Sequence, residues 1–343
     1  MLLGTVNVRY SLFADGYQHK SAGKLNYWIN MNSTGGKRGV NGDLAPASAT
    51  SGIDKTSKTN VKKIEQRLPI LFFHGIGGVF SYLKLINGLT IFGCPIVIVE
   101  MPYVSLHIAP NVPSIDEHVG AVKQILDENG FDGAIIIGHS FGTTVMSWLV
   151  QAMPARIAGA VFLDPVVFML HLRDISFNWM YGSCTNVGHK LEGSGVEDIF
   201  GIVKTELFAA NAVQRHFNWA RNILWAHELQ EKKVETLVLV SGADKVVPSL
   251  EVQRHIEEFN AGMQRKGERS YVGSEVFETA GHGGLVFEEG YRSRALQSIG
   301  SVVEKSHTNW AISKPAVDTT SGTSIVGGDR SEATVSFFAS PLI

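Results

Sequence analysis

Hydrophobic residues follow two different patterns along this chain. From Leu68 onward they form short unbroken apolar runs. These runs are Leu68–Phe73, Pro95–Val99, Gly133–Ile137, Ile157–Leu163 and Val234–Val240. Unbroken runs rich in Val, Ile and Leu are typical of parallel strands covered on both faces. A last strand is expected at Glu275–Thr279. The region therefore predicts a buried, mostly parallel sheet.

Helical spacing separates several of these runs. Ile115, Val119, Val122 and Leu126 follow one another at intervals of four, three and four residues, with charged residues between them. This spacing predicts an amphipathic helix, and the run Thr143–Val150 is also compatible with a helix. Strands that alternate with helices form βαβ units, so we expect the α/β class with a doubly wound sheet.

The N-terminal region shows strict alternation instead. Apolar and polar residues alternate in Thr5–Leu12 and again in Leu25–Met31. This pattern predicts an antiparallel pair of strands with one solvated face, placed at the edge of the sheet. Asn32–Lys63 is rich in Gly, Ser, Thr and Lys, which indicates a long mobile loop.

Two further segments depart from the alternation of strands and helices. Phe168–Lys233 places about 65 residues between consecutive strands, which is too long for a simple crossover and indicates an inserted helical lobe. Val213, Phe217, Ala220 and Leu224 mark one helix in that lobe. The segment from Ser301 onward is dominated by Ser, Thr, Gly and Ala, which predicts a disordered tail. The expected division is 1–67, a core of 68–167 and 234–300, a lobe of 168–233, and a tail of 301–343.

Composition and charge indicate what class of protein this is and which partners it does not bind. The 343 residues are 44% hydrophobic, and 30 Lys and Arg face 32 Asp and Glu, giving a net charge of −2. A globular protein without affinity for nucleic acid is expected. Two cysteines make neither a disulfide framework nor a structural zinc site, which favours a reducing, cytoplasmic location. Polar residues interrupt every long apolar stretch, so we expect no transmembrane span.

The strongest chemical signal is Gly138-His139-Ser140-Phe141-Gly142, between an expected strand and an expected helix. In that context a sharp turn exposes the serine hydroxyl as a nucleophile. Gly138 and Gly142 leave room for neighbouring backbone to approach. The N–H of Phe141 lies at the start of the helix, where it can face a developing negative charge.

Two partners for Ser140 follow in the chain. Asp244 comes just after the strand Val234–Val240, and His282 follows the expected last strand. Serine, acid and histidine occur in this order in one of the known triad arrangements. His282 would take the serine proton, and Asp244 would hold the imidazole. Asp164, which follows the strand ending at Leu163, is the alternative acid.

A glycine-rich loop supplies a candidate anion site. His74, Gly75 and Ile76 follow an apolar strand, and the glycines allow backbone N–H groups to converge. We expect the N–H of Ile76 to pair with that of Phe141 around an oxyanion, and His74 to orient the loop. Phe80 interrupts a dinucleotide fingerprint and no Walker lysine follows, so neither a cofactor nor a metal is expected.

With these residues in place, the chain resembles the α/β-hydrolase superfamily over about residues 68–299. The matching segments are HGIGG, GHSFG, SGADKVVP and GHGG. The resemblance implies a triad of Ser140, Asp244 and His282, and a substrate-shaping cap at Phe168–Lys233. Relatives that open epoxides or displace halide carry Asp at the nucleophile position, so Ser140 favours acyl chemistry.

The lobe is rich in large apolar residues such as Trp179, Phe217 and Trp219, which indicates an apolar pocket above the nucleophile. We therefore expect a serine esterase or lipase-like hydrolase that acts on a small-molecule carboxylic ester, with a lipid-like ester as the narrower hypothesis. An acyltransferase with the same triad and a ligand-binding member without turnover are the alternatives.

Overall fold

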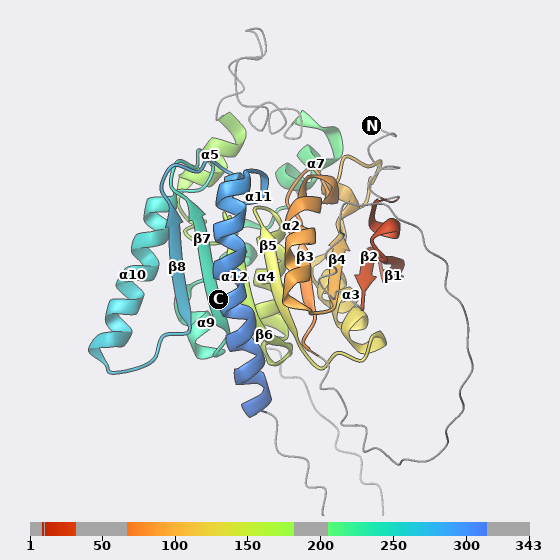
Figure 1. Cartoon of the computed structure of the whole chain (residues 1–343). Coiled ribbons are helices and arrows are strands. Elements are labelled where there is room, and N and C mark those ends of the chain that lie inside the picture. Colours follow the sequence, from red (N-terminus) through yellow and green to blue (C-terminus); the bar gives the residue numbers. More distant parts are fainter. Residues whose placement is uncertain (1–8, 10, 32–66, 182–204, 314–343) are drawn as a thin grey trace, which may run out of the picture.

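A computed structural model describes residues 9, 11–31, 67–181 and 205–313. In this part of the chain, one sheet lies between helices that cover both of its faces (Figure 1). The expected loop at Asn32–Lys63 lies outside the described residues. None of the helices described here combines the length and the apolar character needed to cross a lipid bilayer.

Eight strands form the sheet in the order β1-β2-β4-β3-β5-β6-β7-β8. The pairs β1–β2 and β2–β4 are antiparallel, whereas every other pair is parallel. The predicted doubly wound, mostly parallel sheet with an antiparallel edge pair is thus confirmed. The strands are β1 (Gln18–Ala22), β2 (Leu25–Asn30), β3 (Ile70–Phe73), β4 (Ile96–Glu100), β5 (Ala134–His139), β6 (Ile157–Leu163), β7 (Glu235–Ser241) and β8 (Val272–Phe277).

Helices pack on both faces of the sheet, and each face has its own core. One face is covered by α2, α11 and α12, and the other by α3, α4 and α10. The α-helices are α2 (Leu83–Leu89), α3 (Ile115–Glu128), α4 (Gly142–Ala152), α5 (Arg173–Tyr181), α7 (Leu207–Arg215), α8 (Trp219–Asn222), α9 (Ala226–Glu231), α10 (Ser249–Arg265), α11 (Gly284–Phe287) and α12 (Glu289–Ser313). Short 3-10 helices are η1 (Val79–Tyr82), η2 (Thr90–Phe92), η3 (Pro102–Val104) and η4 (Pro154–Arg156).

The strand β3 shows why the central runs are apolar throughout. Leu71 and Phe73 belong to one core, and Ile70 and Phe72 belong to the other. Successive side chains of a strand point to opposite faces. Because both faces are covered, every position of β3 is buried and no polar alternation remains.

The first predicted strand is wrong in position. Arg9 and residues 11–14 are helical, residues 1–8 and 10 lie outside the described part, and β1 begins only at Gln18. Ala22 pairs with Leu25 across a two-residue turn in which Gly23 has a φ of +52°. A tight turn of this kind sets the register of the hairpin. The sequence QHKSA of β1 is polar because this edge strand is mostly exposed, so alternation did not mark it.

The segment between β6 and β7 differs from the expectation in two ways. The single helix predicted from Val213 to Leu224 is broken, because Asn218 accepts the N–H of Arg221 and begins a new helix, α8. In addition, α9 packs against α10 and β8, at the end of the sheet away from α5 and α7 (Figure 1). The expected lobe of 168–233 therefore includes a helix that belongs to the core.

The C-terminal boundary also moves. Residues 301–313 belong to α12 rather than to a disordered tail, and residues 314–343 lie outside the described part. Val302, Val303 and Ser306 are buried within this helix, which packs along β6 and β7. Burial of one apolar stripe stabilises a helix whose Ser-rich sequence is unfavourable by itself.

Candidate active site

A strained turn joins β5 to α4 and carries Ser140. Its φ is +50°, in the left-handed region that L-residues rarely occupy. The turn is held because the N–H of Ser140 donates to the carbonyl of Leu163, and the carbonyl of Ser140 accepts from Thr143. A Cβ on Gly142 would overlap the carbonyl of Phe73 and lie 2.8 Å from the carbonyl oxygen of His74. Glycine is therefore required where the turn passes β3.

Three of the predicted residues lie in one hydrogen-bonded chain. His282 Nε2 is 2.9 Å from Ser140 Oγ, and His282 Nδ1 is 2.7 Å from Asp244 Oδ2. The other carboxylate oxygen of Asp244 accepts the N–H groups of Val246 and Val247 at 2.7 and 2.9 Å. In the neutral imidazole, Nδ1–H donates to Asp244 and Nε2 accepts from the serine hydroxyl. This arrangement can carry a proton from Ser140 to His282.

The charge of Asp244 governs the ionisation of His282. Burial by itself lowers the pKa of the imidazole, but the attraction and hydrogen bond of Asp244 outweigh it. They raise the pKa of His282 to about 9, and the charge of Asp164 adds to this effect. The pair therefore favours the imidazolium form, which is the form that follows proton transfer from a serine.

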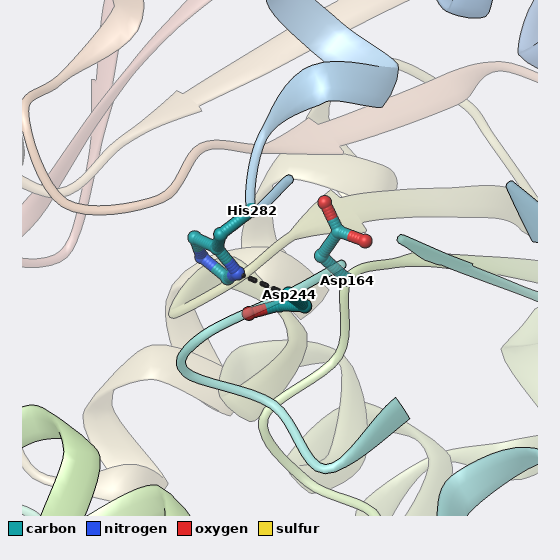
Figure 2. A group of neighbouring side chains, drawn as sticks. All are labelled: Asp164, Asp244 and His282. Carbon is teal, nitrogen blue, oxygen red and sulfur yellow. Dashed lines mark hydrogen bonds and ion pairs between the residues drawn. The ribbon is translucent and has the colours of Figure 1, made fainter. Parts of the chain in front are cut away.

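The alternative acid Asp164 takes a different place. The dashed line in Figure 2 joins His282 to Asp244, whereas the carboxylate of Asp164 is turned away from that bond. Asp164 is fully buried and accepts from the N–H and hydroxyl of Ser241 and, at 2.8 Å, from the N–H of Gly283. It ties the end of β7 to the loop that carries His282.

These two carboxylates and His282 also form the one cluster of possible metal ligands among the described residues. One ligand atom from each residue lies within 4.8 Å of the others. However, backbone N–H groups and the imidazole already occupy the carboxylate oxygens. The hydrogen-bond geometry fits a proton relay better than it fits a cation.

The loop after β3 lies next to Ser140. Ile76, Ser140 and Phe141 line the same small cavity, and the N–H groups of Ile76 and Phe141 donate no hydrogen bond to the described residues. His74 is fully buried, and burial lowers its pKa to about 4, so it is neutral. Its Nδ1–H donates to the carbonyl of Gly75, and its Nε2 accepts the N–H of Met101.

Tyr82 was not identified from the sequence, although it contacts this loop. Its hydroxyl oxygen accepts the N–H of Gly75 at 2.9 Å and lies 2.8 Å from His139 Nδ1. His139 Nε2 in turn faces Asp164 at 3.6 Å. A buried polar chain thus links the loop after β3, the turn that carries Ser140 and Asp164. No spacing rule marks Tyr82, because η1 brings it to the site only in three dimensions.

The cavity at Ser140 is small and almost wholly apolar. Its volume is about 30 Å³. Three of the large residues noted in the lobe, Trp179, Phe217 and Trp219, line it, whereas Phe168 is buried in the core. Its other lining residues include Val166, Ile175, Val213 and Val246.

Comparison with known proteins finds a matching family model and a related lipase segment. A family model for the alpha/beta hydrolase fold matches residues 69–186. A segment of 54 residues is 41% identical to lipase LipV of Mycobacterium tuberculosis, and it represents 16% of this chain and 21% of the lipase. The matched segment thus spans about a fifth of that relative.

Solved structures are similar to this protein over most of its chain. A carboxylesterase structure from the thaumarchaeon Nitrososphaera gargenis is 12% identical, with a TM-score of 0.52, covering 84% of this chain and 99% of that one. A meta-cleavage product hydrolase from Pseudomonas fluorescens is 15% identical, with a TM-score of 0.56 and coverage of 86% and 98%. At such identities the likeness concerns the fold. The sheet order, the helical layers and the family match together show that this chain has the α/β-hydrolase fold.

Proposed function

We infer that the protein is a serine hydrolase that cleaves a carboxylic ester of a largely apolar, small-molecule substrate. The observation that carries this inference is the hydrogen-bonded chain from Ser140 through His282 to Asp244. The apolar cavity beside Ser140 supports a hydrocarbon-like group next to the ester. The partial likeness to a lipase and the fold of the carboxylesterase are consistent with it.

In the proposed reaction, Ser140 Oγ attacks the ester carbonyl while His282 Nε2 accepts the hydroxyl proton. The carbonyl oxygen becomes an oxyanion, and the N–H groups of Ile76 and Phe141 donate to it. The intermediate collapses as His282 returns the proton to the leaving alcohol, which leaves an acyl group on Ser140. A water, deprotonated by His282, then attacks the acyl-enzyme and releases the acid. Asp244 holds the imidazole tautomer throughout.

The test is covalent labelling with a fluorophosphonate, combined with turnover of p-nitrophenyl esters. We expect stoichiometric labelling of the wild type, and loss of both label and turnover in Ser140→Ala, with kcat reduced at least about 10³-fold. Ser147→Ala is the matched control, since this buried serine lies in α4 and donates to Thr144. Label retained in Ser140→Ala would contradict the proposal.

The acyltransferase alternative shares the same acyl-enzyme and is separated by its products. Adding a series of alcohols or amines to the ester assay would divert the acyl group in a transferase, whereas a hydrolase releases mainly the free acid. A wild type that takes up no label and turns over no ester would favour the ligand-binding alternative.

A further inference from the structure

A second and larger cavity lies beside the one at Ser140. Its volume is about 260 Å³, and Phe141 and Phe217 line both cavities. The two rings are 6.0 Å apart between their centroids. The larger cavity extends from these rings toward the start of α3, the middle of α4 and the short helix α8. Two aromatic side chains therefore lie at the boundary between the two cavities.

One polar group in this cavity has an unused donor. Asn222 is fully buried and lines the cavity, and its Oδ1 accepts the indole N–H of Trp148 at 2.7 Å. This bond fixes the amide orientation, so Nδ2 carries the donor hydrogens. Nδ2 has no hydrogen-bond partner among the described residues. A buried donor without a partner destabilises the protein, and a ligand acceptor would remove that cost.

The remaining polar groups of the interior are already engaged. His118 Nδ1 donates to the carbonyl of Ser114 at 2.7 Å, so its Nε2 accepts the hydroxyl of Tyr103 at 2.7 Å. Burial lowers the pKa of His118, which keeps this pair neutral. Asn222 is thus the interior residue with a donor to offer.

The charge of the lining does not suit an anionic ligand. Glu117 lines the cavity, and Lys24 and the N–H of Ser114 bind its carboxylate. No lysine or arginine is among the lining residues. A carboxylate or phosphate would therefore find no lysine or arginine in the lining to bind it, because Lys24 is already paired with Glu117. Aromatic walls from Tyr103, Trp148 and Phe217 suit a flat apolar group instead.

We propose that this cavity is a second chamber of the substrate site. It binds a neutral, ring-sized apolar group that carries a carbonyl or ether oxygen, and this oxygen accepts from Nδ2 of Asn222. The group is the distal part of the ester that Ser140 cleaves, and Phe217 separates it from the reacting carbonyl. The substrate assignment rests on the proposed function, whereas the binding of such a group does not require turnover.

The binding test uses the full chain carrying Ser140→Ala, with acetophenone and ethylbenzene as probes in ligand-observed NMR titrations. The probes share a ring and differ in the carbonyl. We expect acetophenone to bind about tenfold more tightly, as one neutral hydrogen bond provides. Adding Asn222→Leu should remove that advantage. Adding Asn222→Asp, which keeps an oxygen for Trp148 but replaces the Nδ2 donor, should also remove it at pH 8.

Gln151→Leu is the matched control. The Gln151 amide donates to the carbonyl of Ile223, directly after α8, and does not line the cavity. We expect it to preserve the preference for acetophenone. Equal affinity for the two probes, or a preference that persists in both Asn222 variants, would overturn the proposed chamber.

A kinetic test asks whether the second chamber binds part of the ester that Ser140 cleaves. The substrates are p-nitrophenyl esters of 4-(4-acetylphenyl)butanoic acid and of its 4-ethylphenyl analogue. We expect kcat/KM to favour the acetyl ester about tenfold in the wild type and in Gln151→Leu, and to be equal for the two esters in Asn222→Leu. Equal turnover of both esters by the wild type refutes the chamber and leaves the hydrolase intact. Absence of turnover and of fluorophosphonate label refutes the hydrolase, while the acetophenone titration still decides the chamber.

Discussion

In the proposed mechanism, the imidazole of His282 must be neutral to accept the proton of Ser140, and it is charged once it has done so. Asp244 favours the charged form, with a pKa of about 9 for His282. Below that pH the neutral fraction falls tenfold for each pH unit. We therefore expect kcat/KM for an ester to rise with pH and to level off near pH 9 in the wild type.

Replacing the acid tests the origin of that pH profile. In Asp244→Asn the raising influence is lost, so the rising limb should move to lower pH, while the plateau falls by about 10⁴-fold because the tautomer is no longer held. Asp164→Asn should move the limb less, since its charge is a smaller cause of the raised pKa of His282. A larger shift in Asp164→Asn than in Asp244→Asn would exchange the roles of the two carboxylates.

Tyr82 is expected to act as a positioning residue. Tyr82→Phe leaves the N–H of Gly75 without its acceptor and His139 Nδ1 without its partner. The loop that carries Ile76 should lose its fixed position, and we expect kcat to fall about tenfold with little change in KM. Tyr27→Phe is the control, because among the described residues this buried hydroxyl accepts only from Asn129, away from the site. A change confined to melting temperature would assign Tyr82 a structural role alone.

At the scale of elements, the turn between β5 and α4 depends on close contact with β3. Gly142→Ala places a Cβ against the backbone of Phe73 and His74, and no side-chain rotation relieves that overlap. The turn must shift, so we expect ester turnover and fluorophosphonate labelling to fall about 10²-fold. Gly290→Ala, where the added Cβ meets no atom within 4 Å, should retain full activity. Normal labelling of Gly142→Ala would show that the turn tolerates the displacement.

At the scale of the whole molecule, the packing of α12 against β6 holds one layer of helices on the sheet. A Cβ on Gly159 would overlap the Oγ of Ser306, and both residues are buried. Gly159→Ala should therefore destabilise the fold by about 1–3 kcal/mol and lower the melting temperature by about 2–12 °C. Gly120→Ala, on the exposed face of α3 with open space around it, should raise it slightly. Calorimetry of both variants measures these changes in melting temperature.

The order of strands and helices in the core could be predicted because it depends on local burial. Unbroken apolar runs gave β3 to β7 to within a few residues, and the period of 115–126 gave α3. The edge strand β1, the break between α7 and α8 and the end of α12 were missed. Each of these depends on a turn, a cap or a packing partner outside the window over which periodicity is measured.

In the candidate site, too, some residues could be predicted from the sequence and others could not. Ser140, Asp244 and His282 each follow a strand of the sheet, and parallel strands bring their carboxyl ends to one edge, so a meeting of the three could be expected. Tyr82 and Asn222 carry no comparable signal. Their hydrogen bonds join residues from separate elements, as between Asn222 and Trp148. Such pairs are set by packing and by no spacing in the chain.

The sequence by itself determined the class of fold, the turn that presents Ser140 and the order of its partners, because these follow from burial patterns and from residues adjacent in the chain. The tertiary structure alone decided that Asp244 rather than Asp164 bonds to His282, since both acids follow strands. It also decided which side chains enclose the two cavities. The physical reason is range: hydrophobic periodicity is local, whereas hydrogen bonds and cavities depend on atoms brought together from distant segments.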